Sequence, residues 1–250
     1  MSNMDQSVFR PLHLGSCKVA CSNCNLREIC LPVGLTQEEL KHIDDRLVAV
    51  RLKVPRGETL FRAGDRCDSV YAVWTGFFKT CVSSKDGRSQ VAGFHMGGEL
   101  IGLDGIGSRR HEVDAVALED SQVCVIPYDD LEALSLEVVS LQQQFHKIMS
   151  REIVRNHGVM LLLGSMHAEE RLAAFLLNLA HRLRARGFSA SSVLLRMSRE
   201  EIGSFLGLKL ETVSRTFSKF QADGLLRVQQ RQIQITDPVG LQKLLDGAES

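Results

Sequence analysis

Residues 197–215 read MSREEIGSFLGLKLETVSR and divide into two short helices around a tight turn. Ser198 is a typical N-cap residue, and Glu201 follows it by three positions, which is the pattern of a capping box. Gly207 supplies the break that a helix-turn-helix requires between its two helices. The second helix, expected over about 210–222, combines an apolar back with a hydrogen-bonding front near its start. This pattern is typical of a helix that reads the major groove of DNA.

The front of this second helix carries side chains suited to base edges. Arg215 can donate two hydrogen bonds to O6 and N7 of guanine, and Glu211 can accept one from N4 of cytosine. The short Ser214 can contact a base edge or a thymine methyl group. Four residues are expected nearer the phosphates, which position a protein without specifying sequence: Arg199, Lys209, Thr212 and Lys219. The buried stripe on the back of the helix is predicted to be Leu210, Val213, Phe217 and Phe220.

Charge supports a DNA-binding role for this part of the chain only. The 250 residues contain 30 Lys and Arg against 30 Asp and Glu, which excludes a basic or acidic character for the whole chain. Residues 182–231 contain 10 basic and 4 acidic side chains, a local excess that suits phosphate binding. Residues 225–236, LLRVQQRQIQIT, alternate about a turn as the two strands of a wing would.

The first half of the chain has the texture of a β domain. Between residues 48 and 127, short alternating apolar segments are separated by Gly, Asp and Ser at intervals of about 8–12 residues, which predicts an antiparallel barrel or sandwich. The segment KDGR at 85–88 predicts a hairpin turn. Thr36 and Glu39 form a second capping box, which predicts a helix over 36–47.

A long helical segment without proline extends from about 138 to 166. Its apolar positions recur at steps of four and three residues, which is the heptad spacing of helices that pair. This dimer seam is predicted to comprise Met149, Ile153, Asn156, Met160 and Leu163. A helix buried in its own domain is the alternative interpretation. Asn156 is the polar residue on the seam, where Asn can fix register at some cost in stability. A further amphipathic helix follows over 168–186.

Four of the seven cysteines fall within residues 17–30, CKVACSNCNLREIC, which predicts a metal site on thiolate ligands. Thiolate-only sets suit zinc or iron–sulfur clusters, and the spacing does not choose between them. Only one Cys-x2-Cys pair is present, so the fourth ligand can lie elsewhere in the chain. Cys67 and Cys81 are interpreted as small buried hydrophobic residues.

Taken together, these motifs resemble the oxygen-sensing regulators of the fumarate and nitrate reduction (FNR) type, within the cyclic-AMP receptor protein superfamily. The resemblance covers nearly the whole chain. It is carried by C-x3-C-x2-C-x5-C-x-P at 17–32, GFHMGGELIGLDGI at 93–106, ALEDSQVCVIP at 117–127, HAEERLAAFLLNL at 167–179 and E-x2-S-R at 211–215. The resemblance implies an α+β protein with an N-terminal antiparallel, jelly-roll-like β-roll sensor domain, a long dimerisation helix and a C-terminal winged helix-turn-helix. The expected boundaries are 1–35 for the cysteine-rich segment, 36–137 for the roll, 138–168 for the dimerisation helix and 169–250 for the DNA-binding domain.

The resemblance also implies a cofactor and partners. A 4Fe-4S cluster would be held by Cys21, Cys24, Cys30 and Cys124, and Cys17 would not be a ligand. In the family the cluster supports a homodimer on palindromic double-stranded DNA similar to TTGAT, four bases, ATCAA, and oxygen converts the cluster to a 2Fe-2S form before destroying it. Such a regulator controls anaerobic gene expression. The hairpin at 83–89 corresponds to a region that contacts RNA polymerase in the family.

Two departures from the family matter. Cyclic-AMP receptors hold the nucleotide phosphate with an Arg-Ser pair, and Val113 and Asp114 stand there in this sequence, so we expect no cyclic-nucleotide site. Relatives commonly carry Asp on the dimer seam at the position of Asn156. Because facing carboxylates repel, we expect the neutral Asn156 to let this chain dimerise more readily without its cluster.

Other classes of protein are less compatible with the sequence. No Cys–His pairing typical of a nucleophilic enzyme is evident, so the chain is interpreted as a binding protein rather than an enzyme. Neither a signal peptide nor an apolar run of about 20 residues is found, which favours a cytoplasmic protein with no membrane partner. The main alternative is a DNA-binding regulator of the same fold with a structural zinc on the N-terminal cysteines, which would not sense oxygen because zinc has no redox chemistry.

Overall fold

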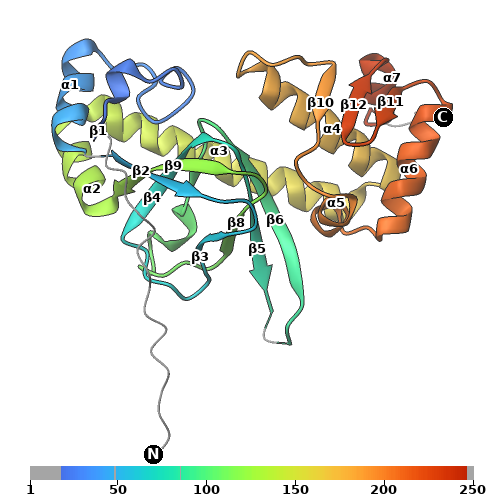
Figure 1. Cartoon of the computed structure of the whole chain (residues 1–250), viewed down its shortest axis with the longest axis horizontal. Coiled ribbons are helices and arrows are strands. Elements are labelled where there is room, and N and C mark those ends of the chain that lie inside the picture. Colours follow the sequence, from blue (N-terminus) through green and yellow to red (C-terminus); the bar gives the residue numbers. More distant parts are fainter. Residues whose placement is uncertain (1–17, 48, 85, 247–250) are drawn as a thin grey trace, which may run out of the picture.

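A computed structural model describes residues 18–47, 49–84 and 86–246. Its first half contains two antiparallel sheets, one with strand order β1-β2-β9-β4-β7 and one with order β3-β8-β5-β6. The strands are β1 (Lys18–Val19), β2 (Ala49–Val54), β3 (Thr59–Phe61), β4 (Ser69–Thr75), β5 (Phe77–Ser83), β6 (Ser89–Met96), β7 (Leu100–Ile101), β8 (Asp114–Ala117) and β9 (Ser121–Pro127). This confirms the predicted antiparallel roll (Figure 1).

The two sheets of the roll pack face to face because apolar side chains point inward at alternate positions of their strands. Val73 and Val123 are paired in register between β4 and β9, and both point inward with at most 1% of their surface exposed. Phe78, fully buried on β5, comes from the opposite sheet and packs into the same apolar cluster. Side chains from both sheets therefore share one interior, as in other two-sheet β domains.

Helices pack against the cysteine-rich end of the roll and continue from it. They are the short 3-10 helices η1 (Cys21–Asn23) and η2 (Leu103–Gly105), and α1 (Gln37–Arg46), α2 (Tyr128–Glu137) and α3 (Val139–Ser165). The capping box predicted at Thr36 is present, because Glu39 N donates to the Thr36 hydroxyl and Thr36 N donates to the Glu39 carboxylate. The predicted long helix is also present, and Figure 1 shows α3 running behind the roll toward the C-terminal part of the chain.

The C-terminal part is a winged helix-turn-helix. Its elements are α4 (Ala168–Arg184), β10 (Ser192–Leu194), α5 (Arg199–Leu206), α6 (Leu210–Ala222), β11 (Leu226–Gln229), β12 (Gln232–Ile235) and α7 (Pro238–Lys243). β11 and β12 form the predicted wing hairpin, and β10 adds a third strand to it. The α+β architecture expected from the sequence is therefore confirmed.

A single hydrophobic core joins the roll to this domain. Phe94 of β6 lies 6.0 Å from Phe175 of α4 and 5.4 Å from Phe205 of α5, measured between ring centroids. Three polar contacts reinforce the packing. Lys79 pairs with Glu201 at 2.8 Å, Glu119 pairs with Arg196 at 2.7 Å, and Val91 N donates to the Ser204 hydroxyl at 2.9 Å.

One predicted core residue is wrong. Leu210 is 44% exposed, whereas Val213, Phe217 and Phe220 are buried as predicted. Leu210 is the first residue of α6, so its side chain projects beyond the end of the core, and the hydroxyl-bearing Thr216 completes the buried stripe instead. Thr216 satisfies its hydroxyl by donating to the Thr212 carbonyl at 2.8 Å, which allows a polar residue to be buried there.

Candidate nucleic-acid interface and metal centre

The turn between α5 and α6 is held by local contacts that the sequence indicated. Glu201 N donates to the Ser198 hydroxyl at 3.1 Å, and Ser198 N donates to the Glu201 carboxylate at 2.6 Å. Gly207 ends α5 in the left-handed conformation with φ 64°, which glycine adopts without steric strain. The carbonyl of Leu208 would lie 2.6 Å from a Cβ at Gly203, so the chain can turn closely only because this residue is glycine.

The structure brings the three predicted base-reading residues onto one side of α6. Glu211 and Arg215 are exposed and one helical turn apart, and Ser214 between them is half-buried. The opposite side of α6 packs into the core through Phe217 and Phe220. A helix anchored in this way presents a rigid polar face, which is the arrangement that major-groove reading requires.

The predicted phosphate contacts are less uniform. Lys209 is exposed at the start of α6, and Thr212 is half-buried. The Arg199 guanidinium lies 4.9 Å from the ring centroid of Phe217. Lys219 donates to Glu169 of α4 at 2.6 Å, and this hydrogen bond raises the pKa of the lysine. Lys219 would therefore have to leave Glu169 in order to contact a phosphate.

Sequence reasoning missed a residue that assembles this domain. The guanidinium of Arg171 donates to three carbonyl groups, those of Leu163 at 2.9 Å, Met166 at 2.8 Å and Leu206 at 2.9 Å. These carbonyls belong to the end of α3, the following link and the end of α5. Arg171 therefore fixes the helix-turn-helix to the long helix, and its position in the motif HAEERLAAF was the only available signal.

The middle of the predicted dimer seam lies on the surface of the described chain. Ile153 and Met160 are 56% and 69% exposed, and Asn156 between them is exposed as well. Met149 and Leu163, at the two ends of the seam, are half-buried against their own chain. Large apolar side chains in the middle of a long helix are thus left exposed by the part of the chain that the structure describes.

The cysteine loop begins at η1 and is folded back on the roll. The Asp44 carboxylate of α1 accepts hydrogen bonds from Cys21 N and Ser22 N. Cys24 N donates to the Cys21 carbonyl at 3.1 Å, and Cys30 N donates to the Leu26 carbonyl at 2.9 Å. These turns place several thiols along one short segment that faces β9.

Three of the predicted ligands share one apolar neighbourhood. Cys21, Cys30 and Cys124 pack against the same core cluster, which also contains Met149, the first residue of the seam. Burial, together with the nearby Cys30, Asp44, Cys124 and Cys24, raises the pKa of Cys21 to about 12. The four thiols are therefore electrostatic neighbours although Cys124 is distant in sequence. Burial also raises the pKa of Cys124, and Arg51 on the adjacent strand opposes that rise.

No group of three or more His, Cys, Asp or Glu side chains among the described residues has an arrangement that holds a metal ion. The chemistry of the donor set nevertheless fits an iron–sulfur cluster, because Cys21, Cys30 and Cys124 lie against one apolar cluster, Cys24 is close enough to influence Cys21, and no histidine belongs to that cluster among the described residues. The thiols must reorient to bind it. Cys67 and Cys81 are buried as predicted, and Cys17 lies outside the described residues.

The stretch that replaces the nucleotide-binding Arg-Ser pair is used for internal contacts. The Asp114 carboxylate accepts a hydrogen bond from Ala63 N at 2.8 Å. A cavity of about 360 Å³ lies between the roll and α3, and Val113, Asp104, Glu152 and Arg155 are among its lining residues. Glu99 of the Gly98–Glu99 loop is engaged by arginines of the chain itself, at 2.6 Å by Arg182 and at 2.7 Å by Arg186.

No helix in the described part of the chain is both long and apolar enough to cross a membrane.

A roll packed on a winged helix-turn-helix through a long helix defines a DNA-binding transcription regulator, and comparison with known proteins agrees. Residues 51–137 match the cyclic nucleotide-binding domain family, and residues 170–244 match the Crp-like helix-turn-helix domain family. The transcriptional regulatory protein btr of Bordetella pertussis is 49% identical over 230 residues, covering 92% of this chain and 94% of that protein. The fumarate and nitrate reduction regulatory protein of Escherichia coli K12 is 39% identical over 240 residues, covering 96% of both chains.

The structure of FixK2 from Bradyrhizobium japonicum is similar with a TM-score of 0.74 and 33% identity, covering 82% of this chain and 100% of that one. The chain belongs to the Crp/Fnr family of transcription regulators. The prediction that it is a regulator and not an enzyme is confirmed by these relatives.

Proposed function

We propose that this regulator responds to oxygen, and that a 4Fe-4S cluster on Cys21, Cys24, Cys30 and Cys124 supports the homodimer that binds a palindromic site. The observation that carries the proposal is the single apolar cluster containing Cys21, Cys30, Cys124 and Met149. Three of the expected ligands and the first residue of the dimer seam pack against this one cluster, so we propose that a change at the thiols is transmitted through it to α3. The names of the relatives, which include an anaerobic regulatory protein of Pasteurella multocida, support the same function.

In this proposal, residues of the chain connect the cysteine ligands to the dimer seam on α3. A bound cluster of this kind would supply reactivity toward oxygen. Cys21, Cys24 and Cys30 bind at one end of the N-terminal loop, and Cys124 ties that loop to β9. The loop then braces α1 and the start of α3, which orients Ile153 and Met160 for pairing with a second copy. Two recognition helices read two half-sites, which multiplies specificity.

The test is an anaerobic purification with iron, sulfide and zinc assays, followed by absorbance measurements while air is admitted. We expect about four irons and four sulfides per chain and a brown colour that bleaches in air. Gel filtration and binding to the palindrome are then measured for both states. One zinc per chain without colour would contradict oxygen sensing and would support the zinc alternative.

The β5–β6 turn is proposed as a contact for RNA polymerase. Its described residues are exposed, and Arg88 pairs with Asp86 at 2.8 Å to give the turn a defined shape. We propose this contact from exposure and from the position of the turn in the family.

Cyclic AMP is expected not to bind. The Asp114 carboxylate would repel a phosphate, and the Glu99 carboxylate is held by arginines rather than free for a ribose hydroxyl group. Isothermal titration calorimetry of the purified protein with millimolar cyclic AMP should show no binding heat above dilution. Micromolar affinity would contradict this prediction.

Replacing Asn156 by Asp should weaken dimerisation of the cluster-free protein. Asn156 is exposed at the centre of the seam, where two added carboxylates would face each other in a dimer. We expect analytical ultracentrifugation to show about a tenfold weaker dimer for Asn156→Asp, the effect of roughly 1.4 kcal/mol of repulsion. Gln143→Glu, which adds the same charge at an exposed α3 position off the seam, is the matched control. Equal dimerisation of the two variants would show that Asn156 does not face its twin.

A further inference from the structure

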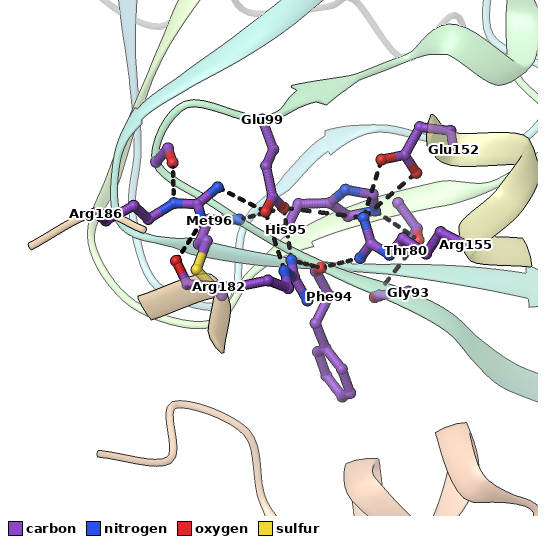
Figure 2. Close-up of polar contacts among 11 residues, drawn as sticks. Thr80, Gly93, Phe94, His95, Met96, Glu99, Glu152, Arg155, Arg182 and Arg186 are labelled. Carbon is purple, nitrogen blue, oxygen red and sulfur yellow. Dashed lines mark hydrogen bonds and ion pairs between the residues drawn. The ribbon is translucent and has the colours of Figure 1, made fainter. Parts of the chain in front are cut away.

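Glu99 is the centre of a buried ion-pair cluster that joins three parts of the chain. Arg182 of α4 and Arg186, two residues beyond the end of α4, contact its carboxylate at 2.6 and 2.7 Å, and Arg155 of α3 lies at 4.0 Å. Figure 2 shows Arg182 and Arg186 approaching Glu99 from one side and Arg155, with its partner Glu152, from the other. The side chain of Glu99 is only 15% exposed.

The arginines also bind the backbone of the roll next to Glu99. Arg182 and Arg155 both donate to the Phe94 carbonyl, at 2.7 and 2.5 Å, and Arg186 donates to the Gly97 carbonyl. Burial by itself would raise the pKa of Glu99, but Arg182, Arg155 and Arg186 together lower it to about 2. The carboxylate therefore stays charged at any physiological pH, and the cluster is a permanent connection between the roll and α4.

The other side of the same loop touches the cysteine segment. Ile29, next to Cys30, lies so close to Gly98 that a Cβ at Gly98 would be 2.8 Å from its side chain. Leu26 lies 3.6 Å from the corresponding position at Gly97. Gly98 also has φ 85°, so a residue with a side chain would be strained there. Residues 97–99 are therefore packed between the cysteine loop on one side and Arg182 and Arg186 on the other.

We propose that residues 97–99 position the DNA-binding domain, and that Glu99 is a positioning residue for DNA reading that relays the location of the cysteine loop to α6. The inference rests on the proposed function for the role of the cysteine loop. It rests on the family membership for the role of α6 in reading DNA. The path is short. Ile29 packs on Gly98, Glu99 holds Arg182 and Arg186, and α4 carries α5 and α6. A shift of the cysteine loop thus changes where the recognition helix lies relative to α3.

Two of the other polar contacts between the roll and the domain are less extensive than the Glu99 cluster. Lys79–Glu201 and Glu119–Arg196 are single ion pairs near the helix-turn-helix, whereas Glu99 contacts both Arg182 of α4 and Arg186 in the turn after it. In a dimer, the placement of the two domains sets the distance between half-sites that can be read together. Loosening the Glu99 contacts should therefore relax the preference for one spacing.

The test compares Glu99→Gln with the wild type on two DNA duplexes. One carries TTGAT and ATCAA separated by four bases, and the other separates the same half-sites by six. Fluorescence anisotropy is measured on full-length anaerobic protein, with iron content and dimer mass recorded in parallel. For Glu99→Gln we expect unchanged iron and dimer mass, about tenfold weaker binding to the four-base duplex, and a preference between duplexes reduced by a similar factor.

Glu152→Gln is the matched control, because it removes the same charge from a residue that pairs at 3.1 Å with Arg155 on its own helix and that forms no ion pair with α4 among the described residues. Circular dichroism shows whether Glu99→Gln folds. If it does not, Arg186→Gln is tested instead, because it removes one of the ion pairs with Glu99 and is expected to give the same loss of spacing preference. Affinity and preference within twofold of Glu152→Gln would overturn the proposal. If the wild-type protein binds neither duplex, the proposed function is contradicted instead. If the wild-type protein contains no iron but binds DNA, the comparison of the two spacings still tests the role of Glu99.

Discussion

Replacing Cys124 by Ser should reduce iron from about four atoms per chain to less than one in anaerobically purified protein. Cys124 pairs in register with Arg51 on β2 and packs against the same core cluster as Cys21 and Cys30, so it is the roll cysteine that we propose as the fourth ligand. Serine is nearly the same size but offers no thiolate. Binding to the palindrome should fall by about a thousandfold or more, to the level of non-specific DNA.

Cys81→Ser is the control for this prediction. Cys81 is also buried in a strand of the roll, but it packs in the core shared with the DNA-binding domain. Its replacement should lower the free energy of unfolding by about 1–3 kcal/mol through burial of a hydroxyl group, with iron content unchanged. Iron and absorbance are measured on both variants in the same anaerobic preparation. Iron retained by Cys124→Ser and lost by Cys81→Ser would reverse the assignment of the fourth ligand.

Replacing Arg215 by Ala should remove most of the sequence-specific part of DNA binding. A bidentate contact between Arg and guanine contributes about 1–3 kcal/mol, and a dimer makes it twice, so the affinity for the palindrome should fall by about 30-fold to 20,000-fold. Arg215 is exposed on α6 and its helix is anchored by Phe217, so the substitution leaves the fold intact.

Two comparisons make the Arg215 prediction specific. Arg215→Lys keeps the positive charge but loses the planar fork, so it should retain the salt dependence and lose discrimination between TTGAT and TTAAT. Arg184→Ala removes the same charge from an exposed position of α4 and should weaken binding to both sequences alike, by a few-fold. Discrimination retained by Arg215→Ala would show that another residue reads the guanine.

Local signals in the sequence predicted most of the fold. The capping boxes at Thr36 and Ser198 and the left-handed Gly207 are set by residues close together in the chain, and each forms as predicted. Leu210 was misplaced because periodicity identifies the face of a helix and does not say where the core beneath it ends. Lys219 was assigned to phosphate from its charge, and its partner Glu169 lies 50 residues away.

The spacing of residues in the sequence could not predict which roll cysteine lies near the cysteine loop, nor the ion-pair cluster at Glu99. Cys81 and Cys124 both occupy strands with similar sequence patterns, and only the packing of the sheets separates their surroundings, one facing the DNA-binding domain and one facing the cysteine loop. In the sequence, Arg182 and Arg186 stand near the expected end of a helix and within a basic region, and nothing there indicates a partner. Their partner Glu99 is 83 and 87 residues away, so the cluster appears only when α4 is packed on the roll.

The hydrophobic core that spans the roll and the helix-turn-helix limits how this regulator can be recombined. Phe94 lies against rings of two different C-terminal helices, so the roll contributes part of the interior of the DNA-binding domain. A chimera cut at residue 168 would leave that aromatic cluster open on both halves and expose Phe175 and Phe205 to water. Exchange of DNA specificity within such a scaffold is therefore better attempted on the outer face of α6 alone, where residues can change without opening the shared interior.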